Sequence, residues 1–216
     1  MHIFEVLSFM EEHVMDKKKT LVITINREYA AGGRSLAAIL SEKLQIPYYD
    51  RDFVKRTVEE SGFDEADVRR EGEAMSRSSK LLDELFNSTV SYNSSHDKIF
   101  EAEKKLIIKL AQSPCIIVGH CANSILDDAG IENISIYLHA PVKSRHARAE
   151  ELNEYGRMDP DKYMEKCDMD RRIFYRQYAG GEISDASNYT FCFDTGKISI
   201  PLCADMVISM LQHEED

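Results

Sequence analysis

The sequence predicts a doubly wound α/β sandwich, in which helices cover both faces of a parallel β-sheet. Short runs of β-branched and other apolar residues recur along the chain, as is typical of strands that are buried on both faces. Stretches with apolar residues at helical spacing follow these runs, so that strand and helix alternate five times. Because crossover connections between parallel strands are right-handed, this order leaves few other architectures.

The composition favours one soluble domain. The chain has 216 residues, of which 43% are hydrophobic, and it contains no long apolar run, so it can bury one core. With 27 basic and 38 acidic residues the net charge is −11, which argues against nucleic acid and against an anionic membrane surface as partners. A phosphate site would therefore need arginines that are concentrated locally.

The cysteines favour a reducing, cytoplasmic environment. Their number is odd, no two have CxxC spacing, and most lie inside apolar segments, so we expect buried thiols rather than disulfides or a metal site. They are Cys115, Cys121, Cys167, Cys192 and Cys203.

Residues 1–18 are expected to form an extension before a domain at 19–216. Acidic residues stand at positions 5, 11 and 12, and the basic cluster follows the apolar residues, which is unlike a signal peptide. We expect a short amphipathic helix or a frayed tail that the fold can do without.

The first predicted unit is a strand at 21–25, a loop of small residues at 30–33 and a helix at 35–44. Where such a loop opens a helix, unpaired backbone N–H groups and the helix dipole suit a phosphate. The same pattern also fits a turn that uses glycine only for packing. The residues alone leave both interpretations open.

This loop matches a P-loop, GxxxxGK[ST], only in part. If Gly32 is the second glycine, Arg27 stands in place of the first and Gly33 in place of the lysine. Arg34 then occupies the hydroxyl position, and Ser35 is the nearest hydroxyl for Mg²⁺. Arg34, being charged and long, is a candidate to compensate for the missing lysine.

The rest of the chain continues the alternation of strands and helices. We expect strands at 46–53, 115–119, 134–140 and 188–194, and helices at 97–113, after Pro141, at 161–178 and at 201–212. Residues 57–94 are polar, and they predict either a mobile helical lobe or a disordered linker. Since ligands bind beyond the carboxyl ends of parallel strands, we expect Asp50 and Arg51 to face the crevice.

Two further groups of arginines are candidates for binding phosphate. Arg145 and Arg148 are three residues apart on one helix face, where two guanidinium groups can chelate phosphate oxygens. Asp168 precedes Arg171 by three residues and Arg172 by four, so it can hold either arginine toward the phosphates of a nucleotide. Surface ion pairs are the alternative interpretation of both groups.

Several segments, in the same order, resemble the cytidylate kinase-like family, whose glycine-rich loop lacks the P-loop lysine. They are ITINREYAAGGRSLAAILSEKLQIPYYDRD, CIIVGHCANSIL, ISIYLHAPVKSRHAR, DMDRRIFYRQYAGG and NYTFCFDTGKISI, which together span roughly residues 21–211. The resemblance implies a three-layer P-loop kinase sandwich with five parallel strands in the order 2-3-1-4-5. It also implies a helical insertion of the monophosphate-binding type at about 54–112 and a lid at about 150–170.

The function implied by the resemblance is ATP- and Mg²⁺-dependent phosphoryl transfer to a nucleoside monophosphate, with CMP as the acceptor. The implied ATP-binding residues are Ala30, Ala31, Gly32, Gly33, Arg34 and Ser35, with Thr195 and Gly196 against the adenine and Ser35 on the metal. The implied catalytic residues are Arg34, Arg145, Arg148 and Arg171. The implied acceptor-binding residues are Asp50, Arg51, Arg56, His120 and Asn123.

The chain departs from the family pattern at several of these positions. His120 and Asn123 stand where the family has Arg and Asp, which removes two charges, and Ala30 and Ala31 replace the usual Gly-Ser. Two rival functions therefore stay open. One is a nucleotide-binding or sensing protein that has lost transfer chemistry, and the other is a kinase for another small metabolite.

Overall fold

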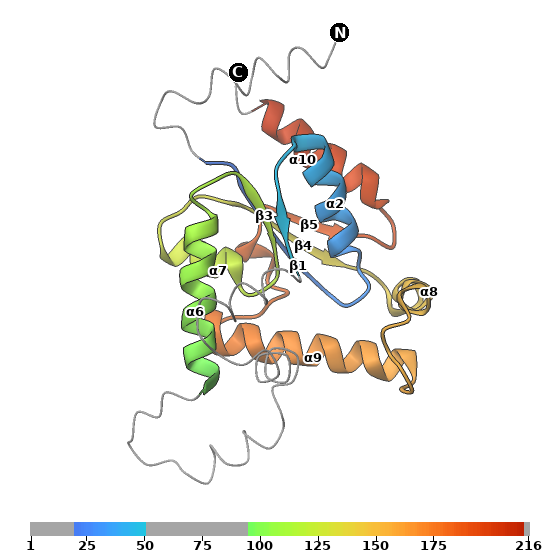
Figure 1. Cartoon of the computed structure of the whole chain (residues 1–216). Coiled ribbons are helices and arrows are strands. Elements are labelled where there is room, and N and C mark those ends of the chain that lie inside the picture. The colour runs from blue at the N-terminus through green and yellow to red at the C-terminus, as the bar shows by residue number, and fades with distance from the viewer. Residues whose placement is uncertain (1–19, 51–94, 214–216) are drawn as a thin grey trace.

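A five-stranded parallel sheet forms the centre of the protein, as the computed structural model in Figure 1 shows for residues 20–50 and 95–213, the part of the chain that the structure describes. The strand order is β2-β3-β1-β4-β5, so the predicted order 2-3-1-4-5 and the α/β fold class are confirmed. The strands are β1 (Val22–Arg27), β2 (Tyr48–Tyr49), β3 (Cys115–Val118), β4 (Ile134–His139) and β5 (Phe191–Asp194).

Helices lie on both sides of this sheet (Figure 1). They are α2 (Gly33–Leu44), α6 (Ser95–Leu110), α7 (Ala122–Asp128), α8 (Val142–Leu152), α9 (Pro160–Ala179) and α10 (Ile200–His213), with a short 3₁₀ helix at Ala186–Asn188. No helix among the described residues is both long enough and apolar enough to cross a membrane.

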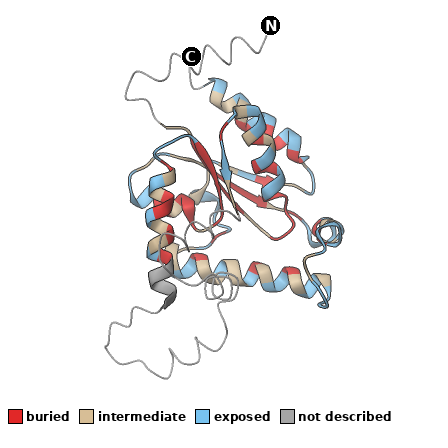
Figure 2. Cartoon of the chain, in the orientation of Figure 1, coloured by how far each residue is buried: buried red, intermediate tan, exposed pale blue. Residues whose placement is uncertain are grey.

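The central strand β1 divides its apolar side chains between the two layers of helices. Ile23 and Ile25 are fully buried against α2 and α10, whereas Val22 packs with α6 and α7 on the opposite face. This alternation follows from the two-residue period of a strand. Figure 2 shows the buried residues concentrated in the strands and on the helix surfaces that face them.

The helix α9 lies at the carboxyl edge of the sheet. It begins at Asp159, whose side chain accepts hydrogen bonds from the N–H groups of Asp161 and Lys162. Pro160 follows at the first helical position, which suits a residue without an N–H group. The helix ends at Gly180, which has a φ of 70°. Because α9 crosses below the sheet (Figure 1), its side chains reach the loop that follows β1.

Some element boundaries differ from the prediction. Strand β2 has only two residues that pair with β3, Tyr48 and Tyr49, and positions 51–53 of the predicted strand lie outside the described residues. Strand β5 begins three residues late, because a 3₁₀ turn capped by the Asp185 side chain occupies its predicted start. The seven-residue helix α7 is absent from the prediction.

The predicted insertion and lid fall on different parts of the structure. Residues 54–94 of the insertion lie outside the described residues, and so does the extension at 1–18. In the described remainder, α6 packs with α7 on the sheet through Leu106 and Ile107, so this helix belongs to the core. The predicted lid at 150–170 corresponds to the end of α8, the turn at 153–159 and the first half of α9.

Candidate functional site

The loop between β1 and α2 turns at Gly32, whose φ of 93° lies in the left-handed region. A Cβ atom there would lie 2.5 Å from Ile200 Cδ1 and 2.7 Å from Arg148 Nη1, and side chains rarely adopt this φ, so the position strongly favours glycine. No side-chain hydrogen bond caps the N-terminus of α2 in the described part of the chain. The N–H groups of its first turn are therefore left for an anion or for water.

The two alanines of this loop pack inside the protein. Ala31 is fully buried in the core beneath α2 and α10, and Ala30, with a φ of 57°, packs against Met164. Their side chains contact other protein groups, so only the loop backbone is placed to contact a phosphate. Gly33 is buried at the start of α2, and Ser35 is exposed in its first turn.

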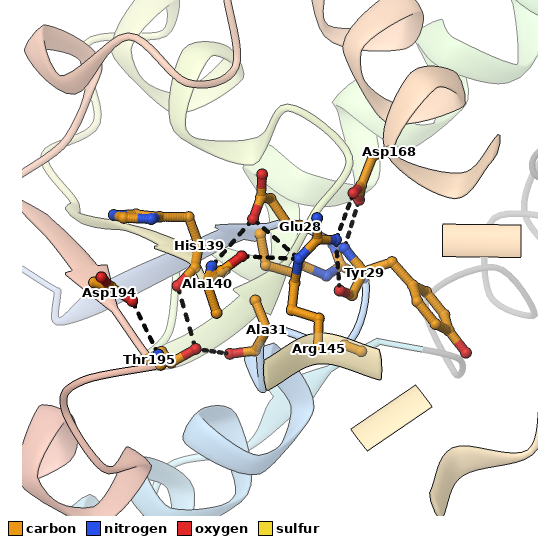
Figure 3. A network of polar contacts seen from close by, with 12 residues as sticks. Glu28, Tyr29, Ala31, His139, Ala140, Arg145, Asp168, Asp194 and Thr195 are labelled. Carbon is orange, nitrogen blue, oxygen red and sulfur yellow. Dashed lines mark hydrogen bonds and ion pairs between the residues drawn. The ribbon is translucent and has the colours of Figure 1, made fainter. Parts of the chain in front are cut away.

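A buried ion pair holds this loop from two distant helices. Arg145 on α8 lies against Asp168 on α9, with Nη1 2.5 Å from Oδ2. The same guanidinium donates to the carbonyl oxygens of Tyr29 and Ala140, and it lies 3.3 Å from Glu28 Oε2. Figure 3 shows the Arg145 side chain surrounded by these partners. Its guanidinium thus faces the protein interior, and its contact with the transferring group stays a prediction.

The end of β5 is attached to the same loop. The Thr195 hydroxyl donates to the carbonyl oxygen of Ala31 at 2.9 Å (Figure 3). The backbone N–H of Thr195 donates to the His139 carbonyl oxygen, and that of Gly196 donates to the Asp194 side chain. Both predicted adenine contacts therefore have their N–H groups in use within the protein. Contact with a base from these residues is left to their carbonyl oxygens and to the Thr195 side chain, whose hydroxyl already donates to Ala31.

Arg34 bridges two carboxylates at the surface. Its Nε lies 2.6 Å from Asp50 Oδ2 at the end of β2, and its Nη1 lies 2.7 Å from Glu154 Oε1 in the turn between α8 and α9. The hydroxyl of Tyr29 also donates to Glu154. The predicted phosphate ligand Arg34 and the predicted acceptor residue Asp50 therefore pair with each other.

Two other arginines approach the loop without a short ion pair to a described residue. Arg148 donates to the Ala30 carbonyl oxygen at 3.3 Å. Arg171 donates to the Arg27 carbonyl oxygen at 3.5 Å, and its Nη1 lies 3.8 Å from Asp168 Oδ1. The Arg171 guanidinium also stands 5.7 Å from the centre of the Tyr29 ring, within range of a cation–π contact.

Arg27, at the end of β1, is a residue of this site that the sequence analysis did not select. Its side chain passes Gly33 and Gly119, and its Nη2 lies 3.7 Å from Asp50 Oδ1. Burial and, after it, the neighbouring Arg171 guanidinium lower the pKa of Arg27 to about 9. The signal in the sequence was the position of Arg27, directly between the predicted strand and the glycine-containing loop. No comparable signal marked Glu154.

The predicted acceptor residue Asn123 is buried, with only 1% of its surface exposed. Its side-chain oxygen accepts from Asn26 Nδ2 at 2.8 Å, and its Nδ2 donates to the Tyr175 hydroxyl at 3.0 Å. The amide therefore satisfies a buried polar network, and the contact of Asn123 with the acceptor stays a prediction. Arg51 and Arg56 lie outside the described residues.

His120 occupies a strained corner after β3. Gly119, His120 and Cys121 are consecutive, and each has a φ between 54° and 90°, although left-handed backbone is unfavourable for residues other than glycine. The His120 Nδ1 atom lies 3.1 Å from Oε1 of Glu103, a buried carboxylate on α6. A carboxylate thus orients the imidazole ring at the carboxyl edge of the sheet.

Comparisons with known proteins agree with this fold. The model of the cytidylate kinase-like family matches residues 22–197. An uncharacterized protein from Eubacterium ventriosum superposes with a TM-score of 0.63 and 23% identity, over 89% of this chain and 99% of that one. Shikimate kinase from Bacteroides thetaiotaomicron superposes with a TM-score of 0.53 and 12% identity, over 89% of this chain and 98% of that one. Shikimate kinase from Acinetobacter baumannii, in complex with shikimate, superposes with a TM-score of 0.50 and 12% identity, over 90% of this chain and 94% of that one. No curated protein matches the sequence.

Proposed function

The chain belongs to the cytidylate kinase-like family, and from this membership and the site geometry we propose that it is an ATP-dependent kinase whose acceptor is a nucleoside monophosphate such as CMP. The observation that carries the proposal is the uncapped N-terminus of α2, with Gly32 before it and the Arg148 guanidinium beside it. Backbone N–H groups, the helix dipole and a guanidinium converge there, and each favours a phosphate.

The distribution of ion pairs indicates which arginines have positive charge left for a phosphate. Arg34 and Arg145 each lie within 2.7 Å of a carboxylate oxygen, so their charge is balanced inside the protein. Arg171 lies 3.8 Å from the nearest carboxylate oxygen among the described residues, and Arg148 binds a carbonyl oxygen. In a chain of net charge −11, Arg148 and Arg171 supply positive charge that a nucleotide can use.

The proposed mechanism rests on positioning and charge. During phosphoryl transfer, negative charge spreads over the equatorial oxygens of the transferring group, where guanidinium groups stabilise it. We assign that role to Arg148 and Arg171, while the loop amides hold the phosphates of ATP. A monophosphate acceptor is already an anion, so no catalytic base is required.

The described residues fit Mg²⁺ through one side chain. Among residues 20–50 and 95–213, no group of three or more His, Cys, Asp or Glu residues could hold a metal ion. Mg²⁺ takes much of its coordination from phosphates and water, which one hydroxyl can complement. Ser35, exposed in the first turn of α2, would hold the ion. When bound, the ion would neutralise negative charge on the phosphates of ATP.

Arg34 and Arg145 act as positioning residues in this proposal. Arg145 fixes the carbonyl oxygen of Tyr29 and thereby the path of the loop. Arg34 connects the end of β2 to the turn after α8 through Asp50 and Glu154. On the acceptor side the described candidates are Asp50 and His120.

A second candidate is a kinase with a hydroxyl acceptor, and the pairing of His120 with Glu103 favours it. A hydroxyl must lose a proton when it attacks phosphorus, and a histidine oriented by a carboxylate is suited to accept that proton. Two of the solved structures with this fold are shikimate kinases, one in complex with shikimate.

An ADP-release assay with ATP, Mg²⁺ and a panel of acceptors tests both candidates. Turnover with CMP or another nucleoside monophosphate supports the first, and turnover with a hydroxy acid such as shikimate supports the second. Binding of ATP without turnover would identify a nucleotide-binding protein without transfer activity. A wild-type protein that does not bind ATP, by calorimetry, would contradict both kinase proposals.

A further inference from the structure

Arg27 enters the phosphate site from the position where a P-loop has its first glycine. Building on the proposed function, we propose that Arg27 supplies the positive charge that the lysine supplies in a conventional P-loop, and that it contacts the phosphates of the bound nucleotide. The proposal rests on the path of the side chain, on its charge balance and on its contrast with Arg34.

Two glycines provide the space for this side chain. A Cβ atom on Gly33 would lie 3.0 Å from Arg27 Cγ and 3.2 Å from Cδ, and one on Gly119 would collide with Nη1. Gly33 is the first residue of α2, and its φ is not positive, so its backbone would accept any residue. A side chain at position 33 would therefore press on Arg27, which would have to shift by a few tenths of an ångström. The aliphatic part of the side chain thus lies against Gly33 at the start of α2, and the guanidinium lies against Gly119 after β3.

The charge of Arg27 is poorly balanced by the described residues. Its nearest described carboxylate oxygen, Asp50 Oδ1, is 3.7 Å away, and Asp50 is also 2.6 Å from Arg34. The side chain is only 17% exposed, and the neighbouring Arg171 adds like charge, which lowers the pKa of Arg27 in addition to the larger effect of burial. A largely buried cation without a close counterion is unfavourable. A phosphate at the N-terminus of α2 would supply the missing negative charge.

Arg34 is closer in sequence to the position of the P-loop lysine, but it is occupied. Both of its described contacts are short ion pairs to carboxylates, at 2.6 Å and 2.7 Å. Recruiting Arg34 to a phosphate would require breaking these pairs, whereas Arg27 has, among the described residues, one ion pair to give up, at 3.7 Å.

The rival explanation is that Arg27 is a structural strut, a side chain that only holds β1 against β3. The thermal stability of the ligand-free protein distinguishes the two explanations. A strut stabilises the ligand-free protein, so replacing it would lower the Tm. An arginine that serves to bind phosphate and lies next to another cation does not stabilise the ligand-free protein. In that case Arg27→Gln should leave the Tm unchanged or raise it.

The test measures the ATP affinity by calorimetry, in the absence of an acceptor, and the Tm without ligand. The variants are Arg27→Gln and Arg27→Lys, and Arg176→Gln is the matched control, because Arg176 is an exposed residue of α9 that pairs with Glu182. We expect Arg27→Gln to weaken ATP binding by about 10- to 100-fold at an unchanged or raised Tm, since it removes hydrogen bonds to a charged group. Arg27→Lys should recover most of the affinity, and the control should bind ATP like the wild type.

Each other outcome overturns the inference. Wild-type affinity in Arg27→Gln would show that Arg27 does not contact the phosphates, while the proposed kinase function would stand. A Tm that falls by several degrees, or a variant that does not fold, would identify the strut instead. If the wild-type protein itself does not bind ATP, the proposed function fails and the role of Arg27 fails with it.

Discussion

Arg145 and Asp168 form a buried ion pair across 23 positions of sequence, with Nη1 2.5 Å from Oδ2. Both side chains are at most 7% exposed, and the other Asp168 oxygen accepts the backbone N–H of Tyr29 at 2.6 Å. The pair therefore connects α8, α9 and the loop after β1. Since that loop precedes the proposed phosphate site, its position depends on charges that come from two other helices.

Removing one member of this pair should destabilise the protein strongly. Asp168→Ala removes the closest counterion of the buried Arg145 guanidinium and leaves it Glu28, at 3.3 Å; breaking comparable buried pairs costs about 3–5 kcal/mol. Urea unfolding should show a correspondingly lower free energy of unfolding. The control is Asp170→Ala, which removes the exposed pair with Lys166 and should cost no more than about 1 kcal/mol. Equal effects in the two variants would contradict a special role for the buried pair.

Replacing Gly32 should damage both stability and nucleotide binding. Gly32→Ala places a Cβ 2.5 Å from Ile200 Cδ1 and forces alanine to adopt a φ of 93°, which costs roughly 1–3 kcal/mol. Gly181→Ala is the control, because a Cβ there meets nothing within 4 Å and its φ is not positive. Urea unfolding and ATP calorimetry on both variants measure the difference. An unaffected Gly32→Ala would show that the loop has room for a side chain.

Arg34 should contribute little to ATP affinity. The sequence suggested that Arg34 compensates for the missing lysine, but the structure pairs it with Asp50 and Glu154. Because exposed ion pairs contribute about 0–1 kcal/mol, Arg34→Gln should change the Kd for ATP by less than about fivefold. Calorimetry on Arg34→Gln beside Arg148→Gln measures this, and the second variant should bind much more weakly. The reverse order would return Arg34 to the phosphate site.

Arg171 should affect the transfer step more than substrate binding. Guanidinium groups that stabilise the transition state of phosphoryl transfer contribute about 10³-fold or more to kcat. Arg171→Met should therefore lower kcat by about that factor with a small change in KM, once an acceptor is known. Arg172→Met, at the adjacent exposed position of α9, is the control. A loss confined to KM would restrict Arg171 to binding.

The strands of the fold were predictable because burial on both faces leaves a direct pattern in the sequence. The runs at 22–25, 115–118 and 136–138 consist of apolar or β-branched residues, and the strands that contain them pair at the centre of the sheet. Helix α7 was missed because it has only seven residues, too few for helical periodicity to be distinctive. Strand β2 was predicted too long because only two of its residues pair.

The roles of the site residues depend on contacts that spacing does not reveal. Arg145 and Arg148 share a helix face by their spacing of three, yet Arg145 turns inward to Asp168 and Arg148 lies beside Gly32. The difference is decided by α9, which begins eight positions after α8 ends and carries Asp168. Arg27 was read only as a departure from the P-loop pattern, because its contacts with Gly33 and Gly119 join segments far apart in the sequence.

His120 separates the two candidate acceptors in one experiment. His120→Asn removes the imidazole but keeps a residue that tolerates the left-handed backbone at a φ of 58°. If the acceptor is a hydroxyl, loss of the base should lower kcat by about 10²- to 10⁴-fold. If the acceptor is a monophosphate, no proton must be removed, so kcat should change little. The Tm of the variant serves as the folding control, because Glu103 loses its imidazole partner. A large loss of kcat with a monophosphate acceptor would contradict the base-free mechanism and assign His120 to transition-state binding.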